Sequence, residues 1–310
     1  MSRRALQLVC LLTIVTAICT GCTSSPSTGR HIDFNKVEVP PDVPAITADS
    51  QALRVAISSV LLPQETVVHY RAIANFLGRT VDRPVILIQR KSYAEIALLL
   101  MNGGADIAFF SSGGYAHYSG LHEIEMLASQ QRMGLPYYQG YILVAKDSAV
   151  NDLADLKGKT VAFTDPLSYS GYTFVAHFLQ QKNETPETFF GRYIYTYSHD
   201  NSLRAVANKI VGAASVTRVV YDRAKQKQPE LTEAVKIIAV SPPAGIGPVV
   251  AGKSVSARQR EILRKALLSL HERSDMALPL QGLSIDRFVP PQPELFEPIK
   301  LMLRAKRAPL

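Results

Sequence analysis

The stretch KTVAFTDPLSYSGYTFVAHFLQ, Lys159 to Gln180, decides the fold. It opens with a short apolar run that predicts a buried strand, and it closes with a longer apolar run that predicts a helix. Between the two runs lie a glycine and three hydroxyl side chains, those of Ser168, Tyr169 and Ser170. In an open α/β sheet, ligands bind where a helix follows the carboxyl end of a strand. The stretch therefore predicts an α/β protein with a candidate ligand-binding turn.

Two interpretations of this turn stay open on the stretch alone. A helix that begins near Ser168 would aim the backbone N–H groups of Ser170 and Gly171 outward, and Gly171 would let an oxyanion approach the backbone closely. The same residues also suit an ordinary helix start, with Ser168 as the N-cap and Gly171 as a turn residue. The first interpretation predicts an anion site, and the second predicts only local structure.

Strand and helix patterns alternate along most of the chain. Residues 53–61, 83–90 and 105–110 predict strands, and the segments between them predict helices. The helix that follows Ser92 has Glu95 at the spacing of a capping box. The alternation starts again near residue 153, so we expect two α/β units, each a mostly parallel sheet flanked by helices. A chain of 310 residues with 47% hydrophobic content is long enough for two such domains.

The first 22 residues predict export and lipidation. Two arginines, an apolar run and a small-residue end at Cys22 are typical of a signal peptide, here residues 1–21. The ending ICTGC resembles the lipobox of bacterial lipoproteins, which implies lipidation of Cys22. An uncleaved membrane anchor and simple secretion are the alternatives. Residues 22–50 are rich in Ser, Thr, Pro and Asp and predict a tether.

Composition excludes several classes of function. No cysteine follows Cys22, so we expect no disulfide, no thiol nucleophile and no Cys-ligated metal in the folded domain. The formal net charge is +8, but basic residues form no long block, which disfavours nucleic acid as a partner. Histidine and carboxylate residues show no metal-site spacing, and we expect neither a cofactor nor an enzyme. The segment HEIEM at residues 122–126 resembles the start of a zinc-protease helix, but Met126 replaces the second histidine, so it predicts a surface helix.

Two longer motifs carry a family resemblance. They are GYILVAKDSAVNDLADLKGKTVAFTDPLSYSGYTF, from Gly140, and YSHDNSLRAVANKIVGAASVTRVVYD, from Tyr197. Together they resemble the substrate-binding proteins of bacterial phosphonate, phosphite and phosphate ABC importers, over roughly residues 53–271. The resemblance implies a two-lobed periplasmic-binding-protein fold of type II with hinge strands. Lobe one would comprise residues 51–139 and 246–310, and lobe two residues 140–245.

The resemblance also implies ligand-binding residues. Matched one at a time to the family's motifs, they are Tyr93, Tyr115, Ser168, Tyr169, Ser170 and His199, with Ser111, Ser112 and Thr217 as further candidates.

The chain departs from the family at three places. Ser111 and Ser112 replace a Gly-Pro pair, Thr217 followed by Arg218 replaces an aspartate, and Ile246 stands near a further carboxylate position. Since an aminoalkyl ligand needs carboxylates for its ammonium, a fully ionised oxyanion is the better match. Arg218 would add charge if it faced inward.

The sequence thus predicts a monomeric, lipid-anchored binding protein of the bacterial envelope. It would capture a small phosphorus oxyanion, namely a phosphonate, phosphite or phosphate, for an ABC permease. One alternative is a sensor that binds the same anions and reports to a membrane kinase. Another is a degenerate envelope lipoprotein that has lost anion binding.

Overall fold

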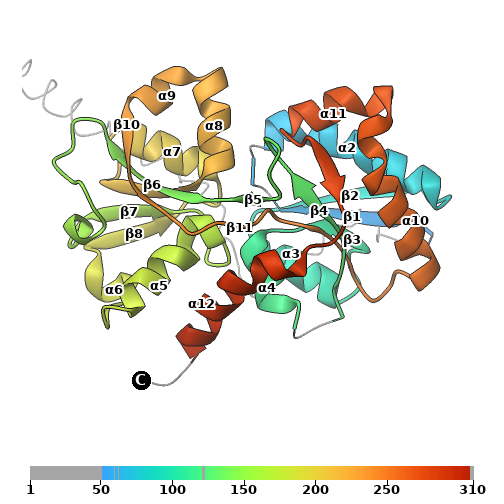
Figure 1. Cartoon of the computed structure of the whole chain (residues 1–310), viewed down its shortest axis with the longest axis horizontal. Coiled ribbons are helices and arrows are strands. Elements are labelled where there is room, and N and C mark those ends of the chain that lie inside the picture. Colours follow the sequence, from blue (N-terminus) through green and yellow to red (C-terminus); the bar gives the residue numbers. More distant parts are fainter. Residues whose placement is uncertain (1–50, 59, 62, 121–122, 308–310) are drawn as a thin grey trace, which may run out of the picture. The chain divides into compact units, whose positions relative to one another are not determined.

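Two β-sheets carry the architecture, and they take their strands from different parts of the chain (Figure 1). The first sheet has the order β13-β4-β12-β3-β1-β2, and the second has the order β10-β6-β9-β7-β8. This computed structural model describes residues 51–307 except 59, 62 and 121–122. The predicted signal peptide, the tether and the lipidation site Cys22 lie outside the described residues.

The first sheet combines strands from both ends of the described chain. Its strands are β1 (Leu53–Ser58), β2 (Val85–Arg90), β3 (Ile107–Phe109), β4 (Glu125–Gln131), β12 (Val249–Ala251) and β13 (Arg287–Val289). Strand β1 pairs in parallel with β2 and β3, and β12 runs antiparallel between β3 and β4. All three residues of β3 are buried, which explains its unbroken apolar sequence.

The second sheet is continuous in sequence. Its strands are β6 (Gly140–Ala145), β7 (Thr160–Phe163), β8 (Arg192–Tyr195), β9 (Ala213–Thr217) and β10 (Val235–Val240). Strand β7 pairs in parallel with β8 and β9, while β6 runs antiparallel to β9 and β10. A two-stranded ribbon of β5 (Tyr137–Tyr138) and β11 (Ala244–Gly245) carries the chain from one sheet to the other and back.

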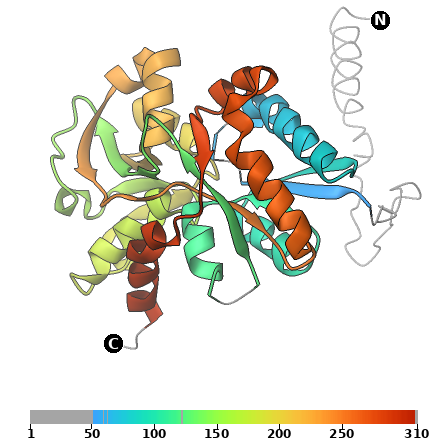
Figure 2. The ribbon, with the colours of Figure 1, turned by 45° about the vertical axis from the view of Figure 1, so that its right-hand side comes forward.

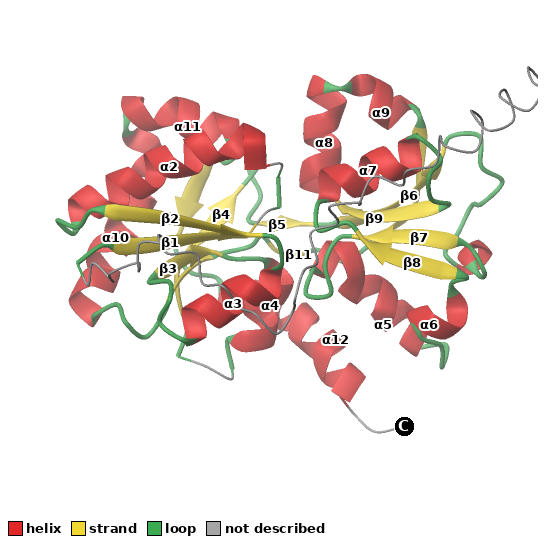
Figure 3. Ribbon diagram, turned by 180° about the vertical axis from the view of Figure 1, so that it is seen from behind, coloured by secondary structure: helices red, strands yellow, loops and turns green. Residues whose placement is uncertain are grey.

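Helices cover both faces of each sheet (Figure 3). On the first sheet, α2 (Pro63–Thr80), α10 (Ala257–Leu268) and α11 (Ala277–Gly282) share one apolar core. The opposite face is covered by α3 (Tyr93–Met101) and α4 (Ser112–Tyr118). On the second sheet, α7 (His199–Ala207), α8 (Arg218–Lys227) and α9 (Pro229–Glu233) cover one face, and α5 (Phe174–Gln180) and α6 (Pro186–Phe189) cover the other.

The predicted capping box at the start of α3 is confirmed. The Glu95 N–H donates to Ser92 Oγ at 3.2 Å, and the Ser92 N–H donates to Glu95 Oε2 at 2.9 Å. Both groups would otherwise be unsatisfied donors at the helix start. The local pattern therefore sets where α3 begins.

The prediction of a surface helix at HEIEM is wrong. Strand β4 begins at Glu125, and Met126, Leu127 and Ala128 are buried in it. The strand lies between β12 and β13, with a sheet neighbour on each side. Met126 packs in the apolar cluster on one face of the sheet and Leu127 in the cluster on the other, so β4 is buried on both faces. The short apolar run of a strand buried on both faces cannot be distinguished by periodicity from a buried helical segment.

The last helix, α12 (Glu297–Arg307), packs against elements of both sheets. It contacts α4, which covers the first sheet, and α5, which covers the second, and Figures 1 and 2 both show it beside these helices. The buried side chains of Phe296 and Ile299 belong to one apolar cluster that extends from α3 to α5. Within the described residues, no helix combines the length and hydropathy needed to cross a bilayer.

Candidate functional site

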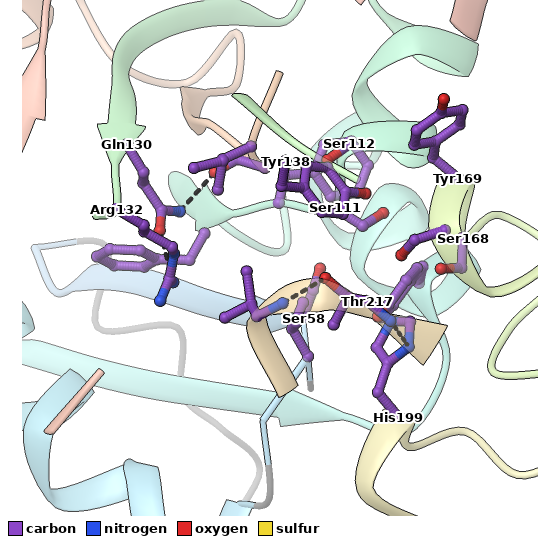
Figure 4. Close-up of a pocket in the computed structure, with 18 of the residues that line it drawn as sticks. Ser58, Ser111, Ser112, Gln130, Arg132, Tyr138, Ser168, Tyr169, His199 and Thr217 are labelled. Carbon is purple, nitrogen blue, oxygen red and sulfur yellow. Dashed lines mark hydrogen bonds between the residues drawn. The ribbon is translucent and has the colours of Figure 1, made fainter. Parts of the chain in front are cut away.

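A pocket of about 50 Å³ opens where strand ends from the two sheets face each other (Figure 4). Ser58 ends β1, Phe109 ends β3, and Thr217 ends β9. Because parallel strands present their carboxyl ends at one edge of a sheet, side chains from distant parts of the sequence meet there. The lining comprises Ser58, Val60, Tyr70, Tyr93, Phe109, Phe110, Ser111, Ser112, Gln130, Arg132, Tyr138, Ser168, Tyr169, Ser170, His199, Thr217, Val219, Ile246 and Gly247. This volume suits a small ligand, since pockets that bind drug-sized ligands have volumes of roughly 300–1,000 Å³.

Several polar groups in this pocket have no protein partner. The hydroxyls of Ser58, Tyr93 and Ser170 and the Nε–H of Arg132 are buried without a hydrogen bond. A buried donor left unsatisfied costs about 1–3 kcal/mol. Four such groups around one cavity indicate a site that binds a polar ligand.

The turn that opens this site combines both sequence interpretations. Ser168 is an N-cap, because its Oγ accepts the Gly171 N–H at 3.0 Å. That donor is therefore not free for a ligand, contrary to the expected cradle. Gly171 is required by packing instead, since a Cβ there would lie 2.6 Å from Thr164 Cβ. Ser168 and Ser170 still line the pocket. Ser170 Oγ has no hydrogen-bond partner, whereas Ser168 Oγ accepts the Gly171 N–H and keeps its own O–H to donate.

Two of the four tyrosines of the lining, Tyr93 and Tyr169, differ in what their hydroxyls do. Tyr169 donates to the Pro242 carbonyl oxygen at 2.6 Å, and burial raises its pKa to about 12. Tyr93 is held by its backbone, whose N–H donates to Asp165 Oδ2 at 3.0 Å, and its hydroxyl is unpartnered. Burial, and next the charge of Asp165, place the pKa of Tyr93 well above its usual value. Tyr93 is thus a neutral donor available to a ligand, whereas the Tyr169 hydroxyl is already bonded and this residue only lines the pocket.

His199 is fixed as a neutral donor. The Thr217 N–H donates to His199 Nδ1 at 3.1 Å, and Thr164 Oγ1 lies 2.9 Å from the same nitrogen. A ring nitrogen that accepts a backbone N–H carries no proton, so the proton is on Nε2. Burial lowers the pKa of His199 to about 3. At neutral pH the ring therefore offers one N–H to a ligand and accepts nothing from it through Nε2.

Among the described residues that line the pocket, Arg132 is the one with a charged side chain, and the sequence analysis missed it. Its guanidinium donates to the carbonyl oxygens of Leu283 and Ser284 and, at 2.8 Å, to Gln130 Oε1. The residue is 8% exposed, and burial lowers its pKa. The sequence signal is the run of polar residues from Ser129 to Arg132, which follows the apolar residues Met126 to Ala128 of β4.

The remaining predicted residues divide between pocket and core. Ser111, Ser112 and Thr217 line the pocket, with Ser111 also capping α4 by accepting the Gly114 N–H at 3.1 Å. Tyr115 lies outside the lining, because α4 turns its ring onto Phe296 with 4.7 Å between ring centroids.

The positions at which the chain departs from the family also divide. Ile246 lines the pocket. The inward-facing alternative for Arg218 is not what the structure shows, since Arg218 Nε donates to Asp222 at 2.9 Å outside the lining. No carboxylate lines the pocket among the described residues.

Comparison with known proteins assigns this chain to a family. Residues 55–296 match a family described as "ABC transporter, phosphonate, periplasmic substrate-binding protein". The chain belongs to this family. The resemblance inferred from the two sequence motifs is confirmed, as is the expectation that the chain is not an enzyme, because this is a family of binding proteins.

Two curated relatives of this phosphonate-binding family illustrate the extent of the similarity. The phosphonates-binding periplasmic protein of Escherichia coli is 33% identical over 127 residues, 40% of this chain and 37% of that protein. The phosphate-import protein of Mycolicibacterium smegmatis is 28% identical over 150 residues, 45% of this chain and 46% of that protein. The chain therefore matches less than half the length of each relative.

Solved structures confirm the two-lobed type II fold. A binding-protein component of an ABC phosphonate transporter from Pseudomonas aeruginosa has a TM-score of 0.75 at 24% identity, covering 83% of this chain and 87% of that one. The protein PhnD1 of Prochlorococcus marinus, in complex with methylphosphonate, has a TM-score of 0.73 at 17% identity, covering 82% and 97%.

In this member of the phosphonate-binding family, residues of the two sheets contact each other around the pocket. The Tyr93 N–H reaches Asp165 across it, and Arg223 of α8 donates to Glu65 of α2 at 2.8 Å. Gly113 lies so close to the Leu167 carbonyl oxygen that a Cβ would approach it to 2.1 Å. The described arrangement is therefore a closed one. No cluster of His, Cys, Asp or Glu suited to a metal occurs in the described residues.

Proposed function

We propose that this protein captures a small phosphorus oxyanion without an ammonium group and delivers it to an ABC permease. One observation carries the proposal: the pocket joins a buried arginine and three unpartnered hydroxyls, and no carboxylate lines it among the described residues. Donors and positive charge suit the oxygens of an anion. The names of the relatives, which refer to phosphonates, phosphate and methylphosphonate, support phosphorus as the central atom.

The absence of carboxylates from the described lining argues against an aminoalkyl phosphonate. An ammonium carries three donors and no acceptor, so burying it requires oxygen acceptors or negative charge nearby. Thr217 and Ile246 occupy the positions at which the resemblance led us to expect carboxylates, and Arg132 adds positive charge. The pocket would repel the ammonium that a carboxylate would attract.

Closure would strengthen these interactions. Lobe one, residues 51–139 and 246–310, and lobe two, residues 140–245, would close over the ligand and exclude water. Hydrogen bonds and charges act more strongly in such a low-dielectric site. Export and lipidation of Cys22 would hold the protein at the bacterial envelope, where the permease lies. Loss of lipid labelling in a Cys22→Ala variant is the direct test of the anchor.

The proposal is tested by thermal unfolding of the chain from Thr23 onward, with millimolar phosphate, phosphite, methylphosphonate, aminoethylphosphonate and sulfate. A ligand that binds only the folded state stabilises it by about 2.7 kcal/mol at a hundred times its dissociation constant. We expect a phosphorus oxyanion to raise the midpoint and aminoethylphosphonate to raise it less.

Ser170→Ala should reduce this shift, because it removes an unpartnered hydroxyl from the pocket. Ser119→Ala, which removes a hydroxyl outside the lining, should leave the shift unchanged. The proposal fails if none of the phosphorus compounds changes the midpoint, or if aminoethylphosphonate gives the largest shift.

A further inference from the structure

Arg132 is a buried cation without a counter-ion. Among the described residues, no carboxylate forms an ion pair with its guanidinium, and its hydrogen-bond partners are two backbone carbonyls and one amide. Charged groups that are buried in proteins are usually paired, because removing them from water is costly. Burial lowers the pKa of Arg132 and the charge of Asp286 acts to raise it, but among the described residues neither this carboxylate nor any other forms an ion pair with the guanidinium.

The donors of Arg132 can be counted. A guanidinium has five N–H groups. Nη1 donates to Leu283 and Ser284, and Nη2 donates one hydrogen to Gln130. The Nε–H has no partner, and the second Nη2 hydrogen has none among these bonds. Two free donors on one planar group match the two oxygens of a carboxylate.

Gln130 holds this arrangement in place. Its Nε2 donates to the Gly247 carbonyl oxygen at 2.5 Å, so its Oε1 is turned toward Arg132. Gly247 itself lies against Phe110, since a Cβ there would approach the Phe110 carbonyl oxygen to 2.2 Å. The guanidinium is therefore positioned by the fold before any ligand arrives.

The charge lies at the opposite end of the pocket from the serine turn. Figure 4 shows Arg132 and Gln130 at one end, and Ser168, Tyr169 and His199 at the other. Apolar side chains also contribute to the lining, among them Val60, Phe109, Val219 and Ile246. A polar end, an apolar wall and a second polar end suit a ligand with two anionic groups on a short carbon link.

We propose that Arg132 binds a second anionic group, so that the preferred ligand is a short phosphonocarboxylate with its phosphonate at Ser170 and His199. This inference rests on the proposed function and narrows its ligand class. A carboxylate is favoured over a second phosphoryl group, because two donors are free and the pocket is only about 50 Å³. If Arg132 served only to hold the Leu283 and Ser284 carbonyl oxygens after α11, its buried Nε–H would stay unsatisfied.

The test needs three ligands and the wild-type protein. Dissociation constants for phosphonoacetate, phosphonoacetamide and methylphosphonate are measured by calorimetry. The amide has almost the shape of the acid but no charge at the end that would face Arg132, so we expect phosphonoacetate to bind about tenfold tighter or more. Methylphosphonate should also bind, because it keeps the phosphonate end. No variant is needed for this comparison, so it stands even if substitutions at Arg132 prevent folding.

Arg132→Gln and Arg132→Lys locate the effect. We expect Gln to abolish the preference for the acid over the amide, and Lys to restore part of it. Arg218→Gln, an arginine outside the lining, is the matched control and should keep the full preference.

Three outcomes overturn the inference in distinguishable ways. If methylphosphonate binds but the acid binds no tighter than the amide, Arg132 has no second anion and only this inference fails. If none of the three ligands binds, the proposed function fails with it. Equal loss of methylphosphonate and phosphonoacetate in Arg132→Gln would place the arginine on the phosphonate instead.

Discussion

The pH dependence of folding tests the state of His199 directly. Its Nδ1 accepts the Thr217 N–H, and burial lowers its pKa to about 3, against an ordinary value near 6.5. Between these two values the unfolded chain binds a proton that the folded protein does not. The free energy of unfolding must therefore rise with pH across this window, and folded protein is destabilised as the pH falls below 6.5.

The magnitude follows from the two pKa values. At pH 5 the unfolded ring is almost fully protonated and the folded ring almost fully neutral. One pKa unit corresponds to about 1.36 kcal/mol, so His199 costs the folded state about 2 kcal/mol at pH 5 relative to pH 8. A His199→Gln variant lacks this titration, while its amide keeps a donor near the position of Nε2.

The assay is urea unfolding of the wild type and His199→Gln at pH 8 and pH 5. The variant should carry a constant cost at both values, because the Thr217 N–H loses its acceptor. The wild type should lose about 2 kcal/mol more than the variant on acidification. Parallel losses would mean that His199 titrates as in an unfolded chain. The site would then hold a second cation near neutral pH, and the argument for a neutral donor would be refuted.

Two further predictions concern closure and charge. Gly113→Ala should weaken oxyanion binding about tenfold by calorimetry, since its Cβ would meet the Leu167 carbonyl oxygen at 2.1 Å when the lobes close. Gly120→Ala should leave oxyanion binding unchanged, because its Cβ would meet no atom within 4 Å. Equal losses of affinity in the two variants would contradict a role for the contact between Gly113 and Leu167. Asp200→Asn should stabilise the protein at pH 8 by up to about 3 kcal/mol. Burial, and next the charge of Glu65, raise the pKa of Asp200 to about 6. Ionisation of Asp200 therefore lowers the free energy of unfolding as the pH rises from 3.8 through 6. By urea unfolding, the stabilisation of Asp200→Asn over the wild type should be about 1 kcal/mol smaller at pH 5 than at pH 8. A stabilisation that grows as the pH falls would contradict the raised pKa of Asp200.

Much of the fold could be predicted because local patterns and tertiary packing agree. The capping box at Ser92, the strand before Thr164 and the helix after Ser170 each have a signal within a few residues of sequence. Strand β4 has no such signal. Its buried residues follow one another without alternation because apolar clusters cover both faces of the sheet, with Met126 in one cluster and Leu127 in the other. Its sheet neighbours β12 and β13 both come from more than 100 residues later in the chain.

The site was predictable only where a motif identifies it. Ser168, Ser170 and His199 belong to motifs, and all three line the pocket. Arg132 belongs to none, and its role depends on Leu283 and Ser284, which are distant in sequence.

The contacts of single residues were harder still to predict. Gly171 could not be assigned from sequence, because the same glycine suits an anion cradle and close packing on Thr164. Tyr115 shows the reverse, since a tyrosine suited to a pocket packs on Phe296 instead. These outcomes depend on distances between segments, which a linear pattern does not contain.

The position of β12 determines which of the two sheets can be completed first during synthesis. This strand lies between β3 and β4 in the first sheet, yet it follows every strand of the second sheet in sequence. As the polypeptide emerges from its N-terminal end, the second sheet can assemble while the first still has a gap at its centre. Premature folding of the first half is thereby hindered until residues 249–251 appear. A chain that must cross a membrane unfolded would benefit from this delay.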